Sequence, residues 1–182
     1  MPERGPILLA MARSAIADAF GLGAADAQPV PAWAAEDGAT FVTLTQGGNL
    51  RGCVGSLSAY RAIARDVRSN AVAAAFHDAR FAPLGRHEIE STRIEVSLLS
   101  AITALPAGSE EDAKQALRPG SDGVVFQWRA YRSTFLPQVW EQLPEPAPFL
   151  QQLKRKAGLP ADFWAPDVVL SRYSVVQWKE AP

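Results

Sequence analysis

The chain has 182 residues, enough for one ordinary domain, and its hydrophobic share of 48% excludes disorder as the dominant state. Lysine and arginine number 18 against 19 aspartates and glutamates, and the net charge of −1 lacks the basic excess of a dedicated nucleic-acid-binding protein. Cys53 is the only cysteine, which excludes an intrachain disulfide and a cysteine-based zinc site.

The first predicted element is an amphipathic helix. Apolar residues recur at three- and four-residue spacing over residues 8–20, with Pro6 near the start and Gly21 just after the end. The apolar stretch inside this helix is interrupted by Arg13, too early for a secretion signal or a membrane span. We therefore expect a cytoplasmic protein with no membrane segment.

A hairpin, a helix and a strand are predicted next. Residues 21–37 indicate an irregular connection, and alternation around a Gly-Gly turn predicts a β-hairpin over 41–54. A helix should begin near Ser58 as its N-cap and bury Val67. Strict alternation over 93–99 predicts a half-buried strand.

The second half of the chain predicts mixed elements again. These are a short helix opened by Ser109, a hairpin over 123–136, a short helix over 137–143, a longer helix over 147–157 and a closing strand over 168–178. Hairpins mixed with separate helices, without a repeating strand–helix–strand pattern, indicate an α+β fold with a mainly antiparallel sheet.

The most informative motif is LRGCVG, residues 50–55. On a strand, Arg51 and Cys53 share one face, and a guanidinium beside a thiol favours the nucleophilic thiolate. Gly52 and Gly55 permit close approach of a ligand or of another backbone segment. The alternative is that Cys53 only packs, because free cysteine is among the most buried residue types.

The sequence HDARF, residues 77–81, is the second candidate. The pair His77-Asp78 is typical of metal phosphohydrolases, but His87 is the only other histidine, so we expect no metal site. Asp78 and Arg80 either bind a ligand or pair as a polar latch at the end of the preceding helix, with the phenylalanine filling the core.

A short basic run, Lys154-Arg155-Lys156, lies near the end of a predicted helix. Cations there suit the helix dipole, and a phosphate or nucleic-acid patch is the alternative. Three charges are too few for the many phosphate contacts of tight binding, so we expect no nucleic-acid partner.

Several of these stretches together resemble the AMMECR domain family. They are FVTLTQGGNLRGCVGSL at 41–57, AAAFHDARFAPL at 73–84, IEVSLLS at 94–100, DGVVFQWRAYRSTFLPQVWEQLP at 122–144 and FLQQLKRKAGLPADFW at 149–164. The resemblance covers nearly the whole chain as a single AMMECR-type domain. One difference is Ala79, where the family usually has a proline that would fix the local φ angle.

The resemblance implies two lobes, large and small, with a cleft between them near LRGCVG. It also implies a place in the AmmeMemoRadiSam system, acting with a Memo-like protein and a radical-SAM protein to modify a small molecule or a protein. SAM and an iron–sulfur cluster are then expected on the radical-SAM partner and no cofactor in this chain, because one cysteine cannot hold a cluster.

Two functions are open at this point. In the first, the chain is an enzyme in which Cys53 is the nucleophile, Arg51 lowers its pKa, and Asp78 or His77 assists proton transfer. In the second, it is a binding or adapter module for a substrate or pathway partner, with a structural cysteine. The residues expected to bind substrate are Gly52, Gly55, His77, Arg80 and Phe81.

Overall fold

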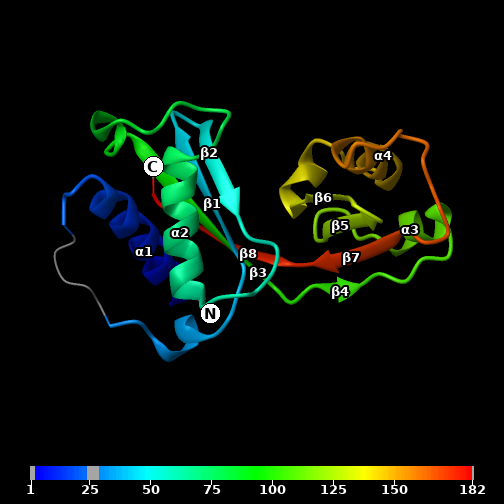
Figure 1. The fold of residues 1–182 in the computed structure, drawn as a ribbon, viewed down its shortest axis with the longest axis horizontal. Helices are drawn as coiled ribbons and strands as arrows, with labels where there is room; N and C mark the ends of the chain where they lie inside the picture. The colour runs from blue at the N-terminus through cyan, green and yellow to red at the C-terminus, as the bar shows by residue number, and fades with distance from the viewer. Residues whose placement is uncertain (1–2, 24–28, 182) are drawn as a thin grey trace. The chain divides into compact units, whose positions relative to one another are not determined.

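The computed structural model describes residues 3–23 and 29–181 (Figure 1). The chain divides into two compact units. Unit 1 runs as far as Leu99 and resumes at Val176, and unit 2 is Ser100–Val175. Each unit has a four-stranded sheet with antiparallel pairing and its own helices. The predicted α+β class is confirmed.

Unit 1 places two helices on one face of its sheet (Figure 1). Its elements are α1 (Arg4–Ala19), η1 (Ala32–Ala35), β1 (Thr40–Gln46), β2 (Asn49–Gly55), α2 (Ile63–Phe76), η2 (Arg86–Glu88), β3 (Thr92–Leu99) and β8 (Val175–Lys179). The strand order is β2-β1-β3-β8, so β2 lies at an edge. Leu8 of α1, Val67 of α2 and Val42 of β1 share one core, and all are fully buried. We call the sheet face away from α1 and α2 the outer face.

The predicted hairpin, the first helix and the strand at 93–99 are confirmed, and the start of the second helix is not. Helix α2 begins at Ile63 rather than near Ser58, with Ala62 as an N-cap that makes no side-chain hydrogen bond. The preceding backbone is used elsewhere: Gly38 donates to the Arg61 carbonyl at 3.1 Å, and Ile63 donates to the Glu36 carbonyl at 2.9 Å. This pairing holds the chain extended until Ile63.

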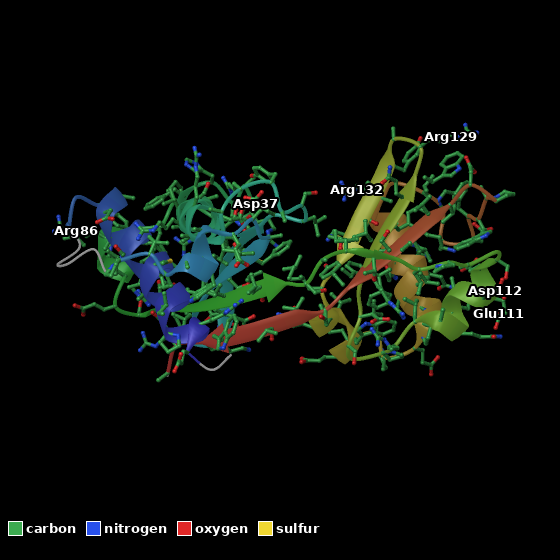
Figure 2. All side chains as sticks on the ribbon, turned by 90° about the horizontal axis from the view of Figure 1, so that it is seen from below. Asp37, Arg86, Glu111, Asp112, Arg129 and Arg132 are labelled. Carbon is green, nitrogen blue, oxygen red and sulfur yellow. The ribbon has the colours of Figure 1, made fainter. Side chains whose placement is uncertain are left out.

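Unit 2 has a second core, which contains several aromatic residues. Its elements are β4 (Thr103–Ala104), α3 (Glu110–Ala116), β5 (Gly123–Trp128), β6 (Tyr131–Phe135), η3 (Pro137–Glu141), α4 (Pro146–Lys156) and β7 (Val169–Tyr173), in sheet order β4-β7-β5-β6. Trp140 stacks on Phe149 with ring centroids 3.7 Å apart. Arg129, at the β5–β6 turn, has a positive φ of 51°, and its side chain extends into solvent (Figure 2).

The prediction of a single closing strand at 168–178 is wrong. The closing segment forms two strands, β7 and β8, which belong to different sheets. The interruption is at Ser174, whose N–H donates to the Ser100 hydroxyl and whose carbonyl accepts from the Ser100 N–H, both at 2.9 Å. The chain passes from unit 2 to unit 1 here, so a continuous run of strand-forming residues serves two sheets.

Two of the three residues in the basic run at the end of α4 make polar contacts with other residues of unit 2. Lys154 is fully buried, and its ammonium lies 2.8 Å from a Glu110 carboxylate oxygen. Lys156 donates to the Thr134 carbonyl at 2.9 Å. These contacts favour the structural interpretation of the run. Over residues 3–23 and 29–181, no helix combines the length and the apolar character that crossing a membrane requires.

Candidate functional site

The motif LRGCVG forms most of edge strand β2. Gly52 is buried against α2, and strand alternation therefore puts Cys53 on the outer face. Cys53 lies opposite Thr43 of β1. The register shifts by one residue between Thr45 and Leu44, and this β-bulge leaves Arg51 without a partner on β1. The bulge re-aims the Arg51 side chain.

The two glycines of the motif allow this chain to pack against itself. A Cβ at Gly52 would collide with the main-chain carbonyl of Ala74 in α2. A Cβ at Gly55 would collide with the ring of Phe41 on β1. The close approach predicted for both positions is therefore made by the protein's own backbone and by one aromatic ring.

The Cys53 thiol is half-buried and makes a side-chain hydrogen bond with Thr43. Its Sγ lies 3.3 Å from the Thr43 hydroxyl. Burial raises the pKa of Cys53, against a smaller lowering by the Thr43 hydrogen bond and by the charge of Arg80. This direction is opposite to the lowered pKa expected from the sequence, and it keeps the thiol protonated at neutral pH.

Asp78 and Arg80 hold the free edge of β2 at Cys53. The Cys53 N–H donates to Asp78 Oδ2 at 2.8 Å, and Arg80 Nη2 donates to the Cys53 carbonyl at 3.3 Å. Arg80 also donates to both Asp78 oxygens, at 2.9 and 2.7 Å. First the Arg80 guanidinium and then the Cys53 N–H hold the pKa of Asp78 far below its usual range. The polar latch is thus present, and it closes on an edge strand that would otherwise expose both groups.

Arg51 makes its hydrogen bonds with the segment after α2 and not with the thiol of Cys53. Its Nε and Nη2 each donate to a Glu88 carboxylate oxygen at 3.0 Å, and its Nη1 donates to the Ala82 carbonyl at 2.9 Å. Hydrogen bonds from Arg51 and, after them, from the Gly85 N–H lower the pKa of Glu88 to about 2. The cation that lowers the pKa of Cys53 is Arg80, not Arg51.

His77 and Phe81 lie away from the thiol's immediate contacts. His77 is exposed and lines a hollow of about 740 Å³ along α2, together with Arg65 and Arg68. Phe81 is half-buried beneath the Arg80 guanidinium, whose carbon lies 5.5 Å from the ring centroid. The residue of this segment that fills the core is Leu84, only 3% exposed. Of the predicted site residues, the structure brings Cys53, Asp78 and Arg80 together.

Two residues that the sequence did not single out complete a polar row on the outer face. Thr43 lies opposite Cys53 on one side and opposite Glu95 of β3 on the other. The Glu95 side chain is only 12% exposed, pairs with Lys179 at 2.8 Å and raises the pKa of Cys53 through its charge. Strand alternation assigns Thr43 and Glu95 to the polar face, but the register that aligns them with Cys53 cannot be read from sequence.

Within the described part of the chain, no three His, Cys, Asp or Glu side chains gather as a metal ion would require. The expectation that the chain holds no metal or cofactor stays a prediction.

A family model named AMMECR1 matches residues 9–178. The chain belongs to the AMMECR1 family. The sequence resemblance is thus confirmed at the level of the family, and LRGCVG and HDARF both lie inside the matched region.

Archaeal relatives show how far the likeness extends. A protein of Saccharolobus islandicus is 31% identical, over 98% of this chain and 82% of its own length. A protein of Methanococcus aeolicus is 34% identical, over 64% of this chain and 59% of its own. A protein of Aeropyrum pernix is 35% identical, over 79% of this chain and 64% of its own length. The chain therefore spans about three fifths of the last two relatives.

A solved structure shares the fold of this AMMECR1 chain. It is the crystal structure of an uncharacterized protein from Pyrococcus horikoshii, with a TM-score of 0.89 and 27% identity. The match covers 98% of this chain and 92% of the other.

Proposed function

We propose that this AMMECR1 protein works in the cytoplasm with a Memo-like protein and a radical-SAM protein, in a pathway that modifies a small molecule or a protein. Its part is to bind the substrate on the outer face of the unit 1 sheet, where Cys53 lies. SAM and the iron–sulfur cluster belong to the radical-SAM partner. The partners come from the family resemblance, and the binding role comes from the contacts around β2.

The observation that carries the binding role is the closed latch on Cys53. Asp78 and Arg80 satisfy both the N–H and the carbonyl of an edge-strand residue. Arg51, two residues before Cys53 on β2, binds the segment that follows Asp78 and Arg80, through Glu88 and the Ala82 carbonyl. These contacts fix a short stretch of edge strand in one position, and a preorganised polar surface binds with a smaller ordering cost.

The protonation state of the thiol also favours binding over nucleophilic attack. The thiolate is the attacking form, and burial disfavours it at Cys53. The cation whose charge lowers the pKa of Cys53, Arg80, is already paired with Asp78 through two side-chain hydrogen bonds. A protonated thiol beside a threonine hydroxyl is a weak hydrogen-bonding group of modest size, which suits a contact with a ligand.

A second function, a thiol nucleophile, is favoured by one observation. The Thr43 hydroxyl is 3.3 Å from the Cys53 sulfur, and the mostly buried Glu95 lies opposite Thr43 in the next strand. This row places a carboxylate one strand beyond the hydroxyl that contacts the sulfur. In this alternative the hydroxyl and carboxylate take the thiol proton when substrate arrives.

Metabolite and protein-modification profiling of cells that lack the chain separates the two functions. The cells are complemented with wild type, Cys53→Ser, Asp78→Ala or Asp162→Ala. Serine keeps a hydrogen-bonding group beside Thr43, so the binding function predicts that Cys53→Ser restores the normal profile. Asp78→Ala opens the latch and should not restore it. Asp162 is an exposed carboxylate of unit 2, and its removal is the matched control.

The outcomes differ clearly. Failure of Cys53→Ser, at a protein level equal to wild type, would establish the nucleophile instead. Full restoration by Asp78→Ala would show that the latched edge of β2 is not the working surface.

A further inference from the structure

A hollow of about 490 Å³ lies in unit 1 beside the β1–β2 turn and the start of β3. Its volume is within the range of sites that hold small molecules. The uncharged part of its lining is the Gly47–Gly48 turn, the hydroxyl residues Thr45 and Ser91, and Ile94. No sequence motif pointed to this place, because its walls come from three separate segments.

Both carboxylates in the lining are already neutralised. Glu95 pairs with Lys179 at 2.8 Å. Glu180 Oε1 accepts from Arg13 Nε at 3.0 Å, and its Oε2 accepts from the Ile94 N–H at 2.9 Å and also contacts Arg13 Nη2. These pairs leave little uncompensated negative charge at the hollow.

Arg93 also lines the hollow and differs from the other charged residues there. Its Nη1 donates to the main-chain carbonyls of Glu90, at 2.7 Å, and Thr92, at 3.5 Å. Across residues 3–23 and 29–181, no carboxylate pairs with it. A guanidinium is always charged and has further N–H donors in a planar fork that fits two oxygens of one anion.

We propose that this hollow binds the carboxylate or phosphate group of a small hydroxylated metabolite, with Arg93 as the residue that receives the anion. Thr45 and Ser91 bring hydroxyl groups to this lining, and the Ser91 hydroxyl, which donates to the Glu88 carbonyl at 3.0 Å, can still accept a hydrogen bond from a hydroxyl group of the ligand. A charge-assisted contact to the guanidinium supplies the main specificity.

The same hollow connects with the row that carries the thiol. Glu95 belongs to its lining, lies opposite Thr43, and Thr43 lies opposite Cys53. Two strand spacings separate Glu95 from Cys53, which is ~10 Å across the sheet. A metabolite held at Arg93 is therefore bound on the same face of the sheet as the thiol. The identification of this ligand as the pathway substrate rests on the proposed function, whereas its binding does not.

The experiment is a titration of ¹⁵N-labelled protein with glycerol 3-phosphate and with glycerate, followed by NMR. Glycerol is the uncharged probe with the same hydroxylated body. The expected result is a saturable shift of the Gly47, Gly48 and Arg93 signals with both anions and none with glycerol. Arg93→Gln should weaken binding at least tenfold, because it removes the charged donor. Arg65→Gln, at another arginine without an ion pair in the described residues, should leave it unchanged.

If no saturable shift occurs up to about 10 mM probe, the proposal is overturned, because a dissociation constant above that concentration would be weaker than that of most small fragments. Equal binding by Arg93→Gln overturns it as well. Either result leaves the complementation test of Cys53 and Asp78 unaffected, so the two proposals fail separately. Binding of glycerate alone, or of glycerol 3-phosphate alone, identifies which anionic group the site takes.

Discussion

Removal of the Asp78 carboxylate should open the latch on β2 and destabilise unit 1. The Asp78 side chain is 7% exposed and accepts the Cys53 N–H at 2.8 Å. A hydrogen bond to a charged group contributes about 1.5–3 kcal/mol. The pair with Arg80 adds at most about 1 kcal/mol, because the Arg80 side chain is 57% exposed. Asp78→Ala should therefore lower the free energy of unfolding by about 1.5–4 kcal/mol.

Two measurements check this prediction. Urea unfolding gives the loss of stability, and amide hydrogen exchange of Cys53 reports the latch directly, because the Cys53 N–H loses the Asp78 carboxylate as its acceptor. The matched control is Asp167→Ala in unit 2. Asp167 also accepts one N–H, from Trp128 at 2.7 Å, and lies 3.8 Å from an arginine, but it is 60% exposed. This control should cost less and leave Cys53 exchange unchanged.

The pH dependence of the effect follows from the lowered pKa of Asp78. A carboxyl group whose pKa is lower in the folded state stabilises the fold fully above its unfolded pKa, here near 3.8. The stabilisation is lost as the pH falls below that value toward the folded pKa. The difference between wild type and Asp78→Ala should thus be constant from pH 5 to pH 8 and shrink only in acid. Unchanged stability and unchanged Cys53 exchange at pH 7 would refute the latch as a structural device.

The remaining predictions concern the thiol and the core. The rate at which a small haloacetamide alkylates Cys53 should have its pH midpoint above the ordinary 9.0, Arg80→Gln should raise it further, and Arg51→Gln should not move it. A wild-type midpoint below 9.0 would contradict the role given to burial. Val67→Asp should cost about 4 kcal/mol or more and unfold unit 1, because Val67 is fully buried. Val176→Asp, at a valine that is 47% exposed, should be tolerated, and a native melting curve for Val67→Asp would contradict the assigned core.

Local patterns predicted most elements because each depends on neighbouring residues. Both hairpins follow from alternation and turn residues, and Ser109 caps α3 by accepting the Asp112 N–H at 3.1 Å. Features that depend on distant partners could not be predicted in this way. The start of α2 is set by pairing with residues 36–38, and Ser174 divides a continuous strand pattern between two sheets.

The candidate site shows the same division. The sequence indicated that Cys53 and Asp78 matter, but their hydrogen bond joins residues 25 positions apart. Arg51 was placed beside the thiol by simple alternation, which a β-bulge cancels, and its partner Glu88 is 37 positions away. The helix dipole alone explained Lys154 from sequence, because nothing near it in sequence predicts the buried pair with Glu110.

The two sequence motifs act on one another, and this changes how variants in either should be interpreted. Arg51 belongs to the first motif but binds the segment that follows the second, through Glu88 and the Ala82 carbonyl. Asp78 and Arg80 belong to the second but bind the main chain of the first at Cys53. Each motif therefore positions the other. Loss of function on changing Arg51 is not by itself evidence for chemistry at the thiol, since the same change releases residues 82–88. Cys53→Ser alters neither set of contacts, which makes it the substitution that separates chemistry from positioning.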